Sequence, residues 1–195
     1  MKTFNYKKSI QALNLFAIRE GGTINYMKAI KLIWLSDRYH LRNHGKTITG
    51  DHYFALKNGP VASCSLDVIK LDSLSPEELI YRSNFLERKG RYNIKSLSPV
   101  IEKVFSKKEL WVLNKIYETY SNMSWSEISE FSHLFPEWKA YEANLKKNKN
   151  TRFTIDMNLF FENVDDNTNL FMNSESEIKE LKEYHREFHP QYCHV

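Results

Sequence analysis

The chain contains few cysteines, glycines and prolines, the residues that form disulfides and tight turns. Its 195 residues include 2 cysteines, 6 glycines and 5 prolines. Cys64 and Cys193 stand far apart and form no spaced pairs, so the sequence predicts no disulfide framework and favours a reducing compartment. Because no Gly-, Pro- or Ser-rich linker divides the chain, we expect one ordinary domain with a full hydrophobic core.

Long apolar runs are also missing. No segment reaches the roughly eighteen uninterrupted apolar residues that a membrane helix needs. The N-terminal segment does not have the order of a signal peptide, because Arg19 and Glu20 stand where a cleavage site would lie. We therefore expect a cytoplasmic protein without a membrane partner.

Charge is unevenly distributed along the chain. Residues 1–60 carry ten Lys plus Arg against three acids, or +7, and the formal total of +4 leaves −3 for the remainder. A basic half can attract an acidic protein surface or nucleic acid, since clustered charge selects partners by sign. The simpler interpretation is that these charges lie on solvated helix faces.

Helical periodicity dominates the sequence. Apolar residues at three-to-four spacing predict one helix over Tyr6–Ala17, ended by Gly21, and a second over Met27–Leu41, ended by Gly45. Later helices are predicted where a Ser and a Glu three residues on can satisfy each other's exposed amides. These capping boxes are Ser106 with Glu109, Ser124 with Glu127, and Ser174 with Glu177. Further helices are predicted over Ser63–Lys70, from Pro136 through Leu145, and after a cap at Asp156.

Extended structure is expected in two places. Residues 47–49 and the pair Tyr53 and Phe54 favour strand, and Asn58–Pro60 forms a turn after them. A hairpin is predicted around Gly90, and the chain after a cap at residues 75–76 is expected to turn extended soon. Together these patterns predict an α+β fold that is predominantly α-helical, a single domain with one small antiparallel sheet or hairpin.

Metal and catalytic motifs are weak. His40 and His44 are four apart on the second predicted helix, but a zincin helix needs Glu where this chain has Leu41. A looser C-terminal cluster consists of His185, His189, Cys193 and His194. There is no Gly-rich phosphate loop and no nucleophile elbow, and Cys64 lacks an adjacent basic residue. We therefore expect that the protein is not an enzyme and that it binds neither a cofactor nor a metal.

One ordered motif stands out between Tyr26 and Val68. It comprises Lys31, Leu32, Trp34–Leu41, Gly45, Ile48–Asp51, Tyr53, Ala55, Lys57 and Gly59–Val61, with a weaker echo at Trp125–Ser129, His133 and Trp138. This pattern resembles the Panacea domain of antitoxins and SocA-like proteolysis adaptors. The resemblance fades past about residue 145. We therefore divide the chain into a Panacea-like domain over 1–145 and a helical C-terminal extension over 146–195.

The resemblance implies a binding protein rather than a catalyst. It predicts the antitoxin of a type II toxin–antitoxin system, which neutralises a cognate protein toxin, for example a translation inhibitor, by direct binding. One alternative, also implied by SocA-like relatives, is an adaptor that delivers the toxin to an ATP-dependent protease. A nucleic-acid-binding autoregulator ranks third, because the sequence holds no recognition-helix signature. The oligomeric state stays open.

The motif residues divide into two predicted roles. Acids and glycines fix local geometry by capping amides and by adopting unusual backbone angles. This structural set is Asp37, Gly50, Asp51, Gly59 and Pro60. Aromatic, Arg and amide side chains combine contact area with directional bonds, so they are assigned either to the framework or to a partner-binding surface. The predicted partner-binding set is Arg38, Tyr39, Arg42, Tyr53, Lys57 and Asn58.

Overall fold

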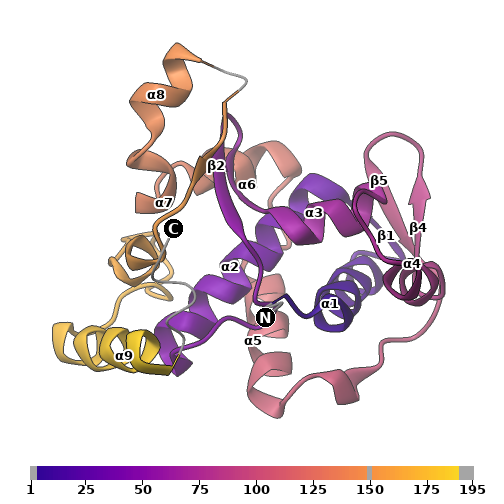
Figure 1. Ribbon diagram of the computed structural model, residues 1–195, viewed down its shortest axis with the longest axis horizontal. Helices are drawn as coiled ribbons and strands as arrows, with labels where there is room; N and C mark the ends of the chain where they lie inside the picture. The colour runs from indigo at the N-terminus through magenta and orange to yellow at the C-terminus, as the bar shows by residue number, and fades with distance from the viewer. Residues whose placement is uncertain (1–3, 149–150, 189–195) are drawn as a thin grey trace.

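The computed structural model describes residues 4–148 and 151–188. A long helix, α2 (Tyr26–His44), runs through the middle of the molecule, and other elements pack around it (Figure 1). Its main helical neighbours are α1 (Tyr6–Arg19), α5 (Lys107–Tyr120) and α6 (Trp125–Ser132). Because α2 is covered on several sides, most of its residues are buried, charged ones included.

The C-terminal end of α2 forms as the sequence predicts, and its N-terminal end is capped by Asn25, which the sequence analysis did not name. The Asn25 side chain accepts a hydrogen bond from the Met27 amide at 2.9 Å, which caps the first turn. At the other end Gly45 adopts a left-handed conformation with φ of 70°, and its amide donates to the Leu41 carbonyl. These caps fix the direction in which the chain leaves toward the motif loop, residues 45–52.

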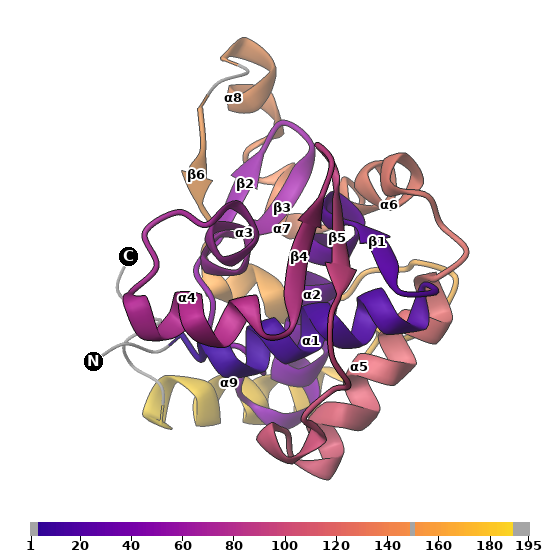
Figure 2. The same cartoon turned by 90° about the vertical axis from the view of Figure 1, so that its right-hand side faces the viewer.

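The strands form two separate three-stranded antiparallel sheets in the described part of the chain, not the one sheet expected from the sequence. The first has the order β1 (Thr23–Asn25), β5 (Asn93–Ser96), β4 (Leu86–Lys89). The second has the order β3 (Gly59–Ala62), β2 (Tyr53–Leu56), β6 (Phe153–Thr154). Figure 2 shows β2, β3 and β6 together on one side and β1, β4 and β5 on the other. The predicted α+β, predominantly helical class is confirmed.

The capping boxes are confirmed. Ser106 and Ser124 each cap their helix in a reciprocal pair with Glu, and Ser174 does the same ahead of α9 (Glu175–Phe188). A fourth box, at Ser75, begins α4 (Pro76–Ser83), where the chain was expected to turn extended. That expectation was wrong, because the box satisfies the first amides and α4 continues through Ser83.

Two other local predictions need correction. Residues 47–49 form a loop rather than a strand, because the amides of Ile48 and Thr49 donate hydrogen bonds to the Asp37 carboxylate instead of to a neighbouring strand. The single helix expected from residue 136 to 145 is split into α7 (Pro136–Lys139) and α8 (Glu142–Lys147). The short helices α3 (Ser63–Lys70), η1 (Glu102–Val104) and η2 (Met157–Phe161) complete the fold.

The C-terminal part packs onto the same core as the rest of the chain. Strand β6 pairs with β2, and η2 and α9 lie against α2. Phe160, Phe161 and Phe171 are buried in the one hydrophobic cluster that also contains Trp34. Over the described residues, no helix combines the length and apolar character needed to cross a bilayer.

Candidate functional site

Asp37 organises the motif loop from within the core. Its carboxylate is fully buried and accepts hydrogen bonds from the amides of Ile48 (2.6 Å) and Thr49 (2.9 Å), from the Thr49 hydroxyl, and from the Tyr53 hydroxyl (2.8 Å). Burial raises the pKa of Asp37 to about 6, although the hydrogen bonds from Thr49 and Tyr53 oppose that rise. One side chain of α2 therefore fixes both the loop and the start of β2.

Asp51 does the equivalent for α3. Its carboxylate accepts from the amides of Cys64 (2.8 Å) and Ser65 (2.9 Å) and from the Ser65 hydroxyl at 2.6 Å. The residue at the N-cap position of α3, Ala62, makes no capping bond through its side chain. Asp51 therefore caps this helix from a position outside it, which locks the β2–β3 hairpin to the motif loop.

Lys31, Gly59 and Pro60 meet at the other end of that hairpin. Lys31 is fully buried, and its ammonium donates to the Pro60 carbonyl at 2.7 Å. Burial lowers the pKa of Lys31 well below its ordinary value. Gly59 has φ of 97°, and a Cβ there would overlap both the Lys31 ammonium and the Ser132 hydroxyl. Glycine is therefore required here by backbone angle and by space.

Arg38 joins α2 to α7. Its Nε donates to Glu137 at 2.5 Å, and both side chains are fully buried. The guanidinium carbon lies 4.9 Å from the ring centre of Phe135 and 4.8 Å from that of Phe171. A buried cation held by a carboxylate and two aromatic faces is a structural centre, since removing either charge would leave the other unpaired.

Arg42 binds the C-terminal part of the chain. Its guanidinium donates to the backbone carbonyls of Phe160 (3.1 Å), Glu162 (2.8 Å) and Phe171 (3.1 Å). It also donates to the side-chain oxygens of Asn163 (2.6 Å) and Asn173 (2.9 Å). A single side chain thus holds segment 160–173 in a fixed path around α2.

The predicted partner-binding residues do not share one surface. Arg38, Arg42 and Tyr53 are buried and hydrogen-bonded inside the molecule, so of the two roles that the sequence left open they fill the framework role here. Lys57 and Asn58 are exposed at the tip of the β2–β3 hairpin. Tyr39 is half-buried on a different part of α2. In the predicted structural set, Gly50 has a left-handed φ of 66° beside Asp51.

Tyr39 belongs to an aromatic patch that sequence reasoning did not find. Its ring lies 6.0 Å from that of Trp111 and 6.3 Å from that of Phe171. Trp111 on α5 is 54% exposed, and Met172 is 47% exposed. The only signal in the sequence was that Trp111 stands outside the apolar stripe of its helix. An exposed Trp beside a Tyr is the type of residue that contributes most to protein interfaces.

Lys57 and Asn58 border a cleft of about 340 Å³ between the first turns of α2, the β2–β3 hairpin and α3. We call it the cationic cleft. Its basic members are Lys31, Lys57, Lys70 and Arg152, and its other lining residues are Tyr26, Met27, Ile30, Leu56, Asn58, Val61, Leu66 and Thr151. No acidic residue lines it among the described residues. The arrangement suits a ligand that is partly apolar and negatively charged.

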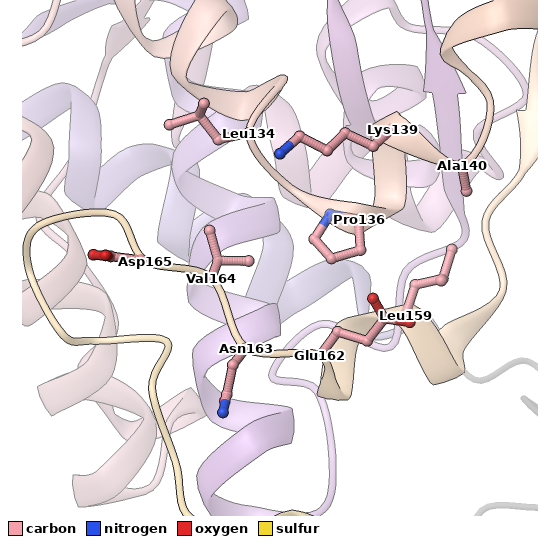
Figure 3. Close-up of a pocket in the computed structure, with 9 residues that line it drawn as sticks. All are labelled: Leu134, Pro136, Lys139, Ala140, Leu159, Glu162, Asn163, Val164 and Asp165. Atoms are coloured by element: carbon pink, nitrogen blue, oxygen red, sulfur yellow. The ribbon is translucent and has the colours of Figure 1, made fainter.

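A larger groove, of about 570 Å³, lies where the end of α6 and α7 meet the segment that Arg42 holds (Figure 3). We call it the junction groove. One side is formed by Leu134, Pro136, Lys139 and Ala140, and the other by Leu159 and Glu162–Asp165. Leu134 is 46% exposed. The groove therefore combines residues from both parts of the chain as divided by sequence.

The histidine pair and Cys64 lie in the framework around the motif loop. His40 and His44 have ring centres 4.7 Å apart, but Nδ1 of His40 donates to the Lys46 carbonyl at 2.6 Å. Burial raises the pKa of the Cys64 thiol to about 12, and the nearby Asp51 adds to that rise. Among residues 4–148 and 151–188, no group of three or more His, Cys, Asp and Glu is placed to hold a metal. Of the C-terminal cluster, only His185 lies within the described residues.

Comparison with known families gives one match. The family model described as antitoxin SocA-like, Panacea domain, matches residues 30–139. The matched range begins in α2 and ends with α7, so it contains Asp37, Asp51 and both partners of the Arg38–Glu137 pair. No curated protein and no solved structure matches the chain.

Proposed function

We propose that this chain, which belongs to the SocA-like Panacea antitoxin family, is the antitoxin of a type II toxin–antitoxin pair and neutralises a cognate protein toxin by binding it directly. Membership of an antitoxin family supports a regulatory, non-enzymatic role and a toxin as the partner. Neutralisation of this kind needs occupation of the toxin's active surface, or preferential binding of an inactive toxin conformation. It requires no chemistry by the antitoxin.

The observation that carries this proposal is the match to the antitoxin family over residues 30–139. The use of the matched residues is consistent with it. Asp37, Asp51 and Arg38 are consumed in internal bonds that hold loop, hairpin and helices in one arrangement. Such a scaffold keeps surface residues in fixed positions, which lowers the entropy lost on binding a partner.

Co-expression tests the proposal. The neighbouring small reading frame is expressed alone and together with this chain, and growth and co-purification are scored. We expect the neighbour to stop growth alone, and this chain to restore growth and to co-purify with it in a direct complex. A neighbour that is harmless alone, or rescue without a complex, would contradict the proposal.

An experiment in a strain that lacks the protease distinguishes direct neutralisation from adaptor function. An adaptor shortens the toxin's half-life only while the ATP-dependent protease is present. A blocking antitoxin leaves the half-life unchanged and protects cells that lack the protease. We therefore expect rescue to persist in a protease-deletion strain, and its loss there would favour the adaptor function.

We further propose that the chain divides its work between scaffold and selectivity. The family match ends at residue 139, and the junction groove lies where matched and unmatched residues meet. Of the polar residues that line this groove, Glu162 lies toward α7 in Figure 3, whereas the Asn163 side chain is turned away and bonded to Arg42. Residues outside the shared family pattern are suited to distinguish one toxin from another, since specificity is a difference between affinities.

A chimera tests this division. The residues after 145 are replaced by those of another family member whose toxin differs, and each toxin is expressed with the chimera. We expect protection against the donor's toxin and loss of protection against the original one. A chimera that still protects only against the original toxin would place selectivity within residues 1–145. The melting temperature of the chimera controls for misfolding.

A further inference from the structure

The cationic cleft carries positive charge that the molecule itself does not neutralise. Neither Lys57 nor Lys70 takes part in an ion pair within the described part of the chain. Both are exposed at the rim. Asp67 interacts with two of the cleft's cations: burial and the neighbouring Asp72 raise the pKa of Asp67, and the charges of Lys70 and Arg152 oppose that rise. Because Lys31 is buried and bonded to Pro60, the accessible charges of the cleft are those of Lys57, Lys70 and Arg152. The half-buried Asp67 carboxylate opposes only one unit of this charge, so a net positive field remains over the cleft.

The walls of the cleft are apolar. Met27, Ile30 and Leu56 contribute to them, together with Val61 and Leu66. Arg152 is held at the edge, with its guanidinium carbon 4.6 Å from the Phe54 ring centre. An apolar cleft surrounded by cations discriminates between ligands. A purely apolar ligand would leave the cations unpaired, and a purely ionic ligand would leave the apolar walls exposed to water.

The size of the cleft and the arrangement of its cations favour a peptide ligand over a nucleic acid. A volume of about 340 Å³ accommodates a few side chains. A nucleic-acid site needs cations in a track that follows the phosphate backbone. Here the cations surround one hollow, and Lys31 lies fully buried beneath it with its ammonium bonded to Pro60. The arrangement fits one carboxylate beside one or two apolar side chains.

We propose that the cationic cleft receives a short segment of the toxin in which an acidic residue stands next to an apolar or aromatic one. This inference rests on the proposed function, since it takes the partner to be a protein toxin. The apolar side chain enters between α2 and α3, and the carboxylate lies between the ammonium groups of Lys57 and Lys70. Asn58 and Thr151 supply further polar contacts at the rim.

Charge reversal at the rim tests the cleft. The double variant Lys57→Glu/Lys70→Glu keeps every buried residue, and its affinity for purified toxin is measured by calorimetry at low and high salt. We expect affinity to fall on the order of a hundredfold and to lose much of its salt dependence. The control is Lys89→Glu on β4, another exposed lysine, which lies in the other sheet. It should bind toxin within about twofold of the wild type.

Cross-linking gives an independent readout. A carbodiimide joins a lysine amine directly to a carboxylate that touches it. In the wild-type complex we expect Lys57 or Lys70 to be joined to an acidic toxin residue that has an apolar neighbour. Lys57→Arg/Lys70→Arg keeps the charge but lacks the amines, so it should bind toxin normally and lose this cross-link.

The outcomes separate the cleft from the proposed function. If the wild type fails to neutralise the toxin, the antitoxin function itself is wrong. If the wild type neutralises it and Lys57→Glu/Lys70→Glu binds within about twofold of the wild type, the cleft proposal is overturned. It is also overturned if the reversal leaves toxin affinity intact but abolishes retention of a single-stranded oligonucleotide, because the cations would then serve nucleic acid.

Discussion

At position 59 the fold leaves no room for a side chain. The Gly59 φ of 97° lies outside the range that other residues adopt easily, and the Lys31 ammonium and Ser132 hydroxyl fill the space where a Cβ would stand. Neither neighbour can retreat freely, since Lys31 is bonded to Pro60 and Ser132 to the Ser129 carbonyl. The glycine therefore sets how closely the hairpin approaches α2 and α6.

Gly59→Ala should lower stability far more than the same change at Gly90. Gly90 also has positive φ, of 66°, but nothing lies within 4 Å of its Cβ position. Backbone strain alone predicts about 1 kcal/mol for Gly90→Ala, and overpacking adds about 2 kcal/mol more for Gly59→Ala. For a chain of this size that separates the two melting temperatures by roughly 4–8 °C. Equal melting temperatures would show that the hairpin can relax away from α2.

His40 makes the stability of the fold depend on pH. Burial lowers the pKa of His40 from its ordinary 6.5 to about 4, and the neighbouring His44 lowers it further. The folded protein therefore keeps a neutral ring where the unfolded chain takes up a proton. This term stabilises the fold fully above pH 6.5 and is lost as the pH falls through 4. The buried acids Asp37 and Asp51, whose pKa values are raised, act in the opposite direction.

His40→Asn should flatten this part of the pH profile. The Asn amide can still donate toward the Lys46 carbonyl, but it does not titrate. We expect the free energy of unfolding of the wild type to lose about 3 kcal/mol relative to the variant between pH 7 and pH 4. Urea denaturation of both proteins at several pH values measures the difference. Parallel profiles would mean that the ring becomes protonated without unfolding.

Sequence reasoning identified the motif residues but not where their partners lie. The acceptors of Arg42 stand 118 to 131 positions later in the chain, in residues that show no family pattern. Arg and Tyr also serve equally well inside a framework or at an interface, so residue type alone left both options open. In contrast, Asp37 meets Ile48 and Thr49 only 11 and 12 positions away, which is near enough for its structural role to be predicted.

At the scale of elements, local signals predicted helix starts well. A capping box needs only four consecutive residues, so the boxes at Ser106, Ser124 and Ser174 were visible in the sequence. The break between α7 and α8 was not visible, because it depends on a distant contact. The Tyr141 ring stacks on Phe153 with centres 5.6 Å apart, and its hydroxyl accepts from the Asp156 amide. Strand β6 has two residues, too few for any periodicity.

Arg42 couples two elements, and hydrogen exchange can measure that coupling. Arg42→Lys keeps the charge but cannot reach five oxygens with one ammonium. We expect amide exchange in residues 157–173 to become on the order of tenfold to a hundredfold faster, while exchange in α1 stays unchanged. Arg186→Lys is the control, since Arg186 makes an exposed 3.3 Å contact with Asn158. Uniform acceleration throughout the chain would indicate global destabilisation instead.

At the scale of the molecule, the uneven charge distribution has an internal explanation. The basic first part of the chain pairs with acids of the later part through Lys8–Glu109, Arg19–Glu118 and Arg38–Glu137. Lys31 and Arg42 are also consumed inside the fold. Much of the excess positive charge therefore serves assembly of the domain. The cationic cleft is where part of it remains accessible.

The boundary at residue 145 stays a prediction, and the packing of the C-terminal part bears on how to test it. A fragment of residues 1–145 would lose β6, the five acceptors of Arg42, and the Phe171 face on Arg38. It would also lose the burial of Phe160, Phe161 and Phe171, which at about 1.5–3 kcal/mol for each side chain is a large part of the total stability of a domain.

We therefore expect residues 1–145 to unfold without a cooperative transition or to aggregate, whereas residues 1–173 should melt cooperatively. The longer fragment keeps every acceptor of Arg42 and, of the described elements, loses only α9 with its cap, which touches the motif loop through His185 and the Gly45 carbonyl at 3.0 Å. Calorimetry of both fragments beside the full chain gives the answer. A cooperative transition in residues 1–145 would show that the Panacea-like part folds alone, and that selectivity can be exchanged at that boundary without rebuilding the Arg42 site.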